Sequence, residues 1–132
     1  MSDLAEKIRQ KLTVDESVMI EQMLDRLSKL LGLTRDGKIL IKFDRTKVTT
    51  RSLISIYAVG KLMAKQAGYS SEDYVSIDEL SRELGIDGKV VGARVSELRR
   101  EGVLISVERG QYKLNPSYIE YILSEVERQI AQ

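Results

Sequence analysis

The chain has 132 residues, 42% apolar and 31% charged, with a formal net charge of +1 at neutral pH. This composition is typical of one folded domain with helical extensions and is too apolar for a disordered chain. The absence of cysteine and histidine excludes disulfides and thiolate or imidazole metal sites, and it removes the usual proton carrier at neutral pH. We therefore expect no metal, no cofactor and no enzymatic activity.

Hydropathy along the chain gives no sign of a membrane segment. No apolar run approaches the length of about 18 residues that a spanning helix needs. The first residues also lack the basic stretch and apolar run of a signal peptide. We expect a cytoplasmic protein.

Residues 1–33 have the pattern of a helical extension. Leu4, Ile8 and Leu12 recur every four residues, which predicts one face of a short helix. Apolar residues from Ile20 to Leu31 then recur at alternating spacings of three and four, which predicts a second helix. Thr13 or Asp15 is its expected N-cap, and we expect Gly32 to end it.

The middle of the chain combines one strand with one long helix. Alternation of apolar and other residues over 38–43 predicts a strand. A helix capped by Thr49 or Thr50 is expected to run to about Ala67 and to end at Gly68. Its apolar residues cover more than a narrow stripe, so we expect it to be central and buried.

Two short helices and a hairpin follow a polar connector over 69–73. Ser76 has capping-box spacing with Glu79, and Gly85 ends that helix at an expected positive φ. Asp87 is the expected cap of the next helix, 88–101, which ends at Gly102. Strands 104–108 and 111–114 are joined by two residues, a hairpin pattern.

Three runs carry a family resemblance: Ile77–Ile86 (IDELSRELGI), Val91–Leu98 (VGARVSEL) and Arg100–Leu104 (REGVL). Together they resemble the winged helix-turn-helix DNA-binding domain, as found in small bacterial and archaeal transcription regulators. With the helix over 50–67 as the first of three, the resemblance covers about half the chain. It implies a mainly α fold with a small β component.

This resemblance sets the expected domain organisation. A winged helix-turn-helix core with a preceding basic strand spans 34–115. Helical extensions over 1–33 and 116–132 flank it, and Asn115 with Pro116 begins the last helix.

The family implies that the helix over 88–101 enters the DNA major groove and that the hairpin over 104–114 acts as a wing. At 100° per residue, Val91, Val95 and Leu98 point inward. The implied DNA contacts are Lys89, Ala93, Ser96 and Arg100 on the outer face, with Arg94, and Arg109 and Lys113 in the wing. Arg82, Arg94 and Arg99 are more typical of solvated or ion-paired positions, and contact with phosphate is the alternative for each.

The outer face of 88–101 also supports a second interpretation. It has no Asn or Gln, and Glu97 would approach phosphate unless it reads a cytosine or pairs with a neighbour such as Arg94 or Arg100. Val90, Gly92 and Ala93 are small or apolar. The alternative function is therefore a protein-docking module of a transcription, replication or repair assembly, with this face on the partner.

Charge is concentrated ahead of the helix-turn-helix. Residues 34–67 carry 8 basic and 2 acidic groups, a net charge of +6. A possible second nucleic-acid patch consists of Lys38, Lys42, Arg45, Lys47 and Arg51. The alternative is a strand edge that lysines protect against aggregation.

Apolar stripes over 20–31 and 119–130 predict association. They are longer than one winged helix needs, and helices of this kind pair across a two-fold axis in dimeric regulators. The alternative is that both fold back on their own core. The expected partners are double-stranded DNA and a second copy, bound through the terminal helices, for a transcription regulator that binds DNA specifically or generally.

Overall fold

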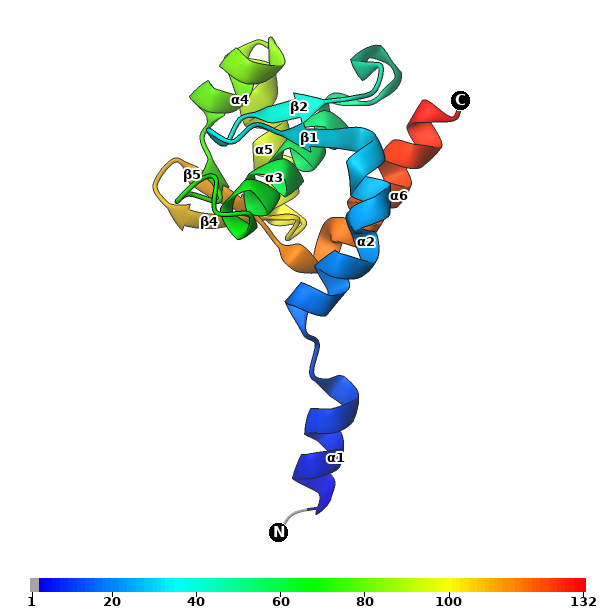
Figure 1. The fold of residues 1–132 in the computed structure, drawn as a ribbon. Coiled ribbons are helices and arrows are strands. Elements are labelled where there is room, and N and C mark those ends of the chain that lie inside the picture. Colours follow the sequence, from blue (N-terminus) through cyan, green and yellow to red (C-terminus); the bar gives the residue numbers. More distant parts are fainter. Residues whose placement is uncertain (1–2) are drawn as a thin grey trace.

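The computed structural model describes residues 3–132 and is mainly α with two small antiparallel sheets (Figure 1), which confirms the expected fold class. The helices are α1 (Asp3–Leu12), α2 (Glu16–Leu30), α3 (Thr50–Gln66), α4 (Ile77–Leu84), α5 (Gly88–Arg100) and α6 (Ile119–Ile130). The strands are β1 (Leu31–Leu33), β2 (Ile39–Ile41), β3 (Tyr74–Val75), β4 (Leu104–Glu108) and β5 (Gln111–Leu114). Two short 3-10 helices are η1 (Arg45–Lys47) and η2 (Pro116–Tyr118).

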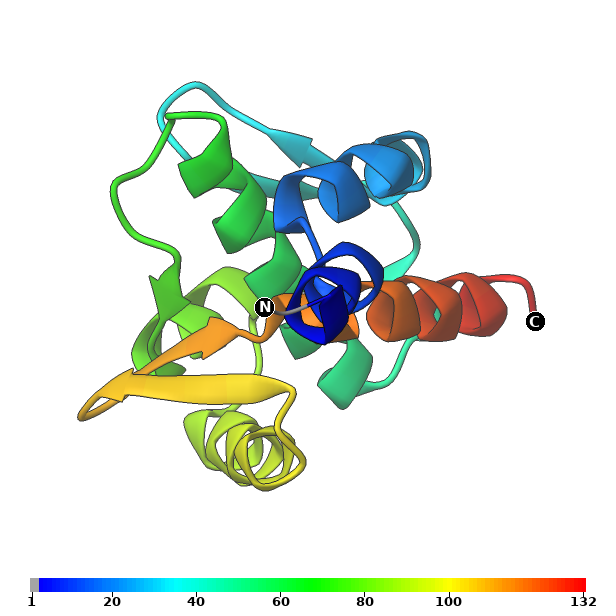
Figure 2. The same cartoon turned by 90° about the horizontal axis from the view of Figure 1, so that it is seen from below.

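Helix α3 is the central element, as its apolar pattern predicts. Thr49 caps it by accepting a hydrogen bond from the backbone N–H of Ser52. Ile54, Ile56, Ala58 and Val59 are all fully buried, because α6, α5 and both sheets pack around this helix (Figure 2). The burial of apolar side chains on all sides is what fixes the positions of the surrounding elements.

A two-stranded hairpin covers one side of α3 and corrects the predicted end of α2. The helix ends at Leu30 rather than at Gly32, and Leu31–Leu33 form β1, paired with β2. Leu31 lies opposite Ile41 and is buried, and the backbone N–H of Lys42 donates to the Leu30 carbonyl. Strand pairing thus overrides the helix preference of the leucines.

The two short helices and the hairpin lie within one residue of their predicted bounds, and α5 ends at Arg100 rather than at residue 101. Ser76 caps α4, Asp87 caps α5, and Gly85 between them has φ +66°. Strands β4 and β5 pair through the turn at Arg109 and Gly110. The sequence pattern does not show β3, a two-residue strand that pairs with β5 and completes a sheet of order β3-β5-β4.

The apolar stripe of α6 is buried within the same chain. Ile119, Ile122, Leu123 and Val126 are at most 3% exposed. A 3-10 turn, η2, precedes α6, so Pro116 lies in that turn and not in the α-helix. The last helix therefore folds back on the core of its own chain, which is the alternative stated above for the stripe over 119–130.

Helices α2 and α6 are joined by ion pairs as well as by apolar contacts. The Arg26 guanidinium donates to Glu120 at 2.6 Å and to Glu127 at 2.7 Å. These bonds raise the pKa of Arg26 and lower that of Glu127. Met23, Leu27 and Leu30 of α2 are buried beneath them, so much of the stripe over 20–31 is also covered.

Helix α1 projects away from the rest of the molecule (Figure 1). None of its residues is buried, although its apolar face at Leu4, Ile8 and Leu12 forms as predicted. None of the helices among residues 3–132 combines the length and apolar character needed to cross a bilayer.

Gly60 allows the β1–β2 hairpin to lie close to α3. A Cβ atom at Gly60 would lie 2.6 Å from Cγ2 of Ile39. We expect Gly60→Ala to destabilise the fold by about 1–3 kcal/mol through overpacking, measured by urea denaturation. In Gly92→Ala the new Cβ has ordinary contact with Ile77 at 3.7 Å, so that control should gain about 0.5–1 kcal/mol. Equal effects of the two changes would contradict the packing argument.

Candidate nucleic-acid interface

Helix α5 presents the predicted face to solvent. Val91, Val95 and Leu98 are at most 1% exposed and pack against the core. The side chains predicted to point outward, Lys89, Ala93, Ser96 and Arg100, are all exposed. Val90 is also exposed and Gly92 is half-buried.

The turn that aims α5 is held by side chains from two elements. Arg45 of η1 donates to the Leu84 carbonyl at the end of α4. The Ser81 hydroxyl donates to the Ile86 carbonyl. The first bond satisfies a carbonyl at the end of α4 that has no partner within the helix, and the second satisfies a carbonyl of the turn. Together they hold the turn between α4 and α5.

Glu97, the acidic group on α5 that would repel phosphate, is paired. Its carboxylate lies 2.8 Å from the Arg94 guanidinium and 3.5 Å from that of Arg51. Arg94 is therefore engaged in an ion pair with Glu97. A face that meets a polyanion needs Glu97 to be paired in this way. The negative charge of Glu97 is neutralised within the protein.

Arg51 also anchors the end of α5. It donates two hydrogen bonds of 2.7 Å to the two carboxylate oxygens of Glu101, the bidentate geometry that makes such pairs strong. The bonds to Arg51 lower the pKa of Glu101, and those to Glu101 raise the pKa of Arg51. The start of α3 and the end of α5 are therefore tied together.

Five cations on α5 and the hairpin have no salt bridge within residues 3–132: Lys89, Arg99, Arg100, Arg109 and Lys113. Arg99, which sequence reasoning ranked low, is exposed and belongs with the four that it ranked higher. Arg94 differs from Arg99 by its ion pair with Glu97, which follows it by three residues on the same helix, so the helical spacing of the sequence carries a signal for this difference.

The hairpin places its two cations at different depths. Arg109 is exposed at the tip, where Gly110 has φ +78°. Lys113 is half-buried on β5, opposite Ile105 of β4. Ile105 and Val107 are exposed at 39% and 44%, so β4 also carries apolar surface.

The second basic patch is divided among separate roles. Arg51 and Arg45 bind α5 and α4 as described above. The Lys42 ammonium donates to the Ser28 carbonyl at 3.0 Å. Lys38 and Lys47 are exposed in the β1–β2 turn and in η1, so the structure does not gather all five cations on one free surface.

A polar cluster of one buried and two half-buried side chains lies between α3 and α4. The Tyr57 hydroxyl donates to Glu79 at 2.7 Å, and the Lys61 ammonium lies 3.1 Å from the same oxygen. Burial, together with the bond to Glu79, raises the pKa of Tyr57. Each group satisfies another, so the cluster fixes α4 on α3. Within residues 3–132 no group of three acidic side chains is arranged to hold a metal ion.

Comparisons of the chain with protein-family models, with curated proteins and with solved structures gave no match.

The Arg51–Glu101 pair makes a testable contribution to stability. Because the folded-state pKa of Glu101 lies below its ordinary value of 4.5, the pair stabilises the fold above that pH and loses this effect as the pH falls. We expect Glu101→Gln to lower Tm at pH 7, and the difference from the natural chain to shrink below about pH 4.5.

Thermal melts between pH 3 and pH 7, followed by circular dichroism, measure this difference. Glu108→Gln is the control, because Glu108 is an exposed acid of the hairpin without a salt bridge in the described part of the chain. A Tm difference for Glu101→Gln that stays constant over the whole pH range would contradict the ion-pair explanation.

Proposed function

We propose that the chain is a winged helix-turn-helix protein that binds double-stranded DNA as a dimeric, cytoplasmic transcription regulator. Helix α5 enters the major groove, and the β4–β5 hairpin contacts the adjacent backbone. The order of elements α3, β3, α4, α5, β4 and β5 supports this assignment.

The observation that carries the proposal is that acids on and beside α5 form ion pairs within the protein, whereas several cations of α5 do not. Glu97 of α5 and Glu101 at its C-terminal end are paired with Arg94 and Arg51. Asp87 at the start of α5 and Glu108 of the hairpin have no salt bridge in the described part of the chain. The unpaired cations Lys89, Arg99 and Arg100 remain on α5. Cations without internal partners are the groups that exchange counterions for phosphates.

The outer face of α5 divides these contacts by type. Lys89 and Arg100 stand near opposite ends of the helix, where they reach phosphates or guanine edges. Ser96 and Ala93 lie between them and can meet a base edge and a thymine methyl group. This face offers few base-specific donors, so phosphate contacts supply most of the affinity.

The first test is binding of a random duplex of about 30 base pairs at salt concentrations between about 50 and 200 mM, measured by fluorescence anisotropy. We expect affinity to fall steeply with salt. Joint replacement of Lys89, Arg100 and Arg109 by Ala should weaken binding and reduce the slope of log K against log salt by about 0.9 for each lost phosphate contact.

The matched control removes three cations from other elements: Lys29, Lys65 and Arg128. It makes the same change in net charge and should leave the slope nearly unchanged. An equal loss of affinity in both triple variants would mean that binding depends on net charge alone. Absence of binding at low salt would contradict the proposal.

The apolar surface of this region supports protein docking as the second candidate function. Val90 is 41% exposed on α5, and Ile105 and Val107 of β4 are exposed as well. A partner could pack on Val90, Gly92 and Ala93, as winged helices in multiprotein assemblies do.

A double variant, Val90→Ser with Ala93→Ser, separates the two functions. It removes apolar contact and keeps every cation, so docking to a protein partner should be lost while affinity for random duplex changes little. Retention of a partner in pull-down by this variant would contradict docking through this face.

A further inference from the structure

Exposed apolar side chains are concentrated at the N-terminal end of the molecule. Of the twelve large apolar side chains exposed among residues 3–132, six lie between Leu4 and Leu24. Leu4, Ile8 and Leu12 form one face of α1 and are exposed at 70%, 46% and 71%. A helix of ten residues that buries none of its side chains is marginal in water, so a cover over this face would stabilise it.

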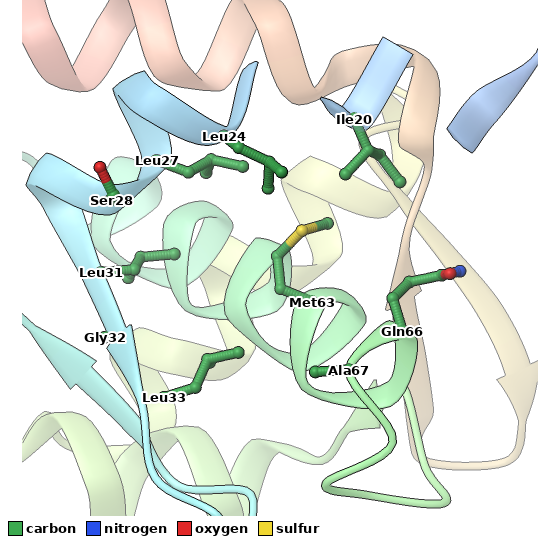
Figure 3. A pocket seen from close by; sticks show the side chains of 10 residues that line it. All are labelled: Ile20, Leu24, Leu27, Ser28, Leu31, Gly32, Leu33, Met63, Gln66 and Ala67. Atoms are coloured by element: carbon green, nitrogen blue, oxygen red, sulfur yellow. The ribbon is translucent and has the colours of Figure 1, made fainter. Parts of the chain in front are cut away.

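An apolar pocket of about 380 Å³ lies between α2, β1 and the C-terminal end of α3 (Figure 3). Ile20, Leu24 and Met63 point toward it, and Leu24 is 49% exposed. No charged residue lines it. The Ser28 hydroxyl donates to the Asp25 carbonyl, so the Gln66 amide is the main polar group of a lining that is otherwise apolar.

The helix and the pocket match in character and in length. From Leu4 to Leu12 the apolar face of α1 extends about 12 Å, at 1.5 Å per residue. From Ile20 to Leu27 the apolar wall of α2 extends about 10 Å by the same measure. Each chain therefore carries both an apolar helix face without a partner and an apolar pocket able to receive one.

The link between α1 and α2 directs α1 away from its own pocket. The backbone N–H of Thr13 donates to the Arg9 carbonyl and continues α1. The Asp15 side chain accepts from the N–H of Ser17 and caps α2. Only Val14 lies outside these two hydrogen-bonding patterns, and in this arrangement α1 extends away from α2, β1 and α3 of its own chain (Figure 1).

We propose that α1 of each chain docks in the α2–β1–α3 pocket of a second copy, so that two chains exchange their N-terminal helices. Such an exchange is isologous: the contact from α1 to the pocket occurs twice, and the dimer is closed. This inference deepens the proposed function, since it rests on the dimeric state stated there and names the surfaces that form the dimer.

Cross-linking between single-cysteine variants tests the exchange, because the natural chain contains no cysteine. Full-length Ile8→Cys is mixed with full-length Leu24→Cys that carries a size tag, and the mixture is oxidised with copper phenanthroline. We expect a disulfide between one tagged and one untagged chain. Gln10→Cys, on the opposite face of α1, is the matched control and should give little of this product.

Two outcomes would overturn the exchange. One is an internal disulfide in the Ile8→Cys, Leu24→Cys double variant without any product between chains, since α1 would then cover its own pocket. The other is the absence of both products.

Light scattering gives an independent reading of the same proposal. The natural chain should have twice the 15.0 kDa mass of one chain. We expect Ile8→Asp to raise the dimer dissociation constant about 100-fold or more, because an apolar contact is lost twice. At a concentration where both proteins are monomers, the Tm of Ile8→Asp should equal that of the natural chain, since α1 buries no residue in its own chain. A natural chain that stays at 15.0 kDa at all concentrations would contradict the exchange.

Duplex binding distinguishes this inference from the proposed function. A disulfide between chains in a protein that does not bind DNA would support the exchange and contradict DNA binding. Salt-dependent duplex binding without a disulfide-linked product between chains would support DNA binding and contradict the exchange.

Discussion

The burial of α3 on all its sides is the constraint on which the rest of the structure depends. Fully burying a side chain such as Ile54 or Ile56 contributes about 1.5–3 kcal/mol, and α3 can bury so many only if other elements cover every side. The β1–β2 hairpin, α4, α5, the three-stranded sheet and α6 each contact it. The position of α5, and hence the face it exposes, follows from the need to cover α3.

Arginine side chains then divide into those that hold this arrangement and those that remain available. Arg26 joins α2 to α6, Arg45 joins η1 to the end of α4, and Arg51 joins α3 to the end of α5. Arg100 and Arg109 have no such partner in the described part of the chain. A basic stretch in the sequence can therefore serve the interior of the fold, while the cations without salt bridges on α5 and the hairpin lie outside that stretch.

Local signals in the sequence predict most of the fold. Caps at Thr49, Ser76 and Asp87 mark where helices begin, and Gly85, with its positive φ, marks the turn between α4 and α5. These features depend on neighbours within a few residues, which is why a single sequence contains them.

Features that arise from distant pairing are the ones that the sequence does not predict. Gly32 looks like a helix end, yet β2 draws Leu31–Leu33 into a strand. Strand β3 exists only because β5 lies beside it. In the candidate site, the helical period identifies which side chains of α5 face outward and offers Arg94 as a partner of Glu97, but it does not indicate the contact of Glu97 with Arg51 of α3. Such contacts join segments far apart in the chain or depend on the final orientation of side chains.

The shape of β4 has a consequence for solubility. In the sheet order β3-β5-β4, β4 is an outer strand, and its free edge offers unpaired backbone groups beside the exposed Ile105 and Val107. An edge of this kind is a template for another strand and therefore for aggregation. The register of β4 shifts between Ser106 and Glu108, and such a bulge bends the strand and increases its twist. A bent, short edge that ends in Glu108 and Arg109 is a poor surface for a second β4, so the irregularity of the hairpin protects the folded chain from pairing edge to edge with its own copies.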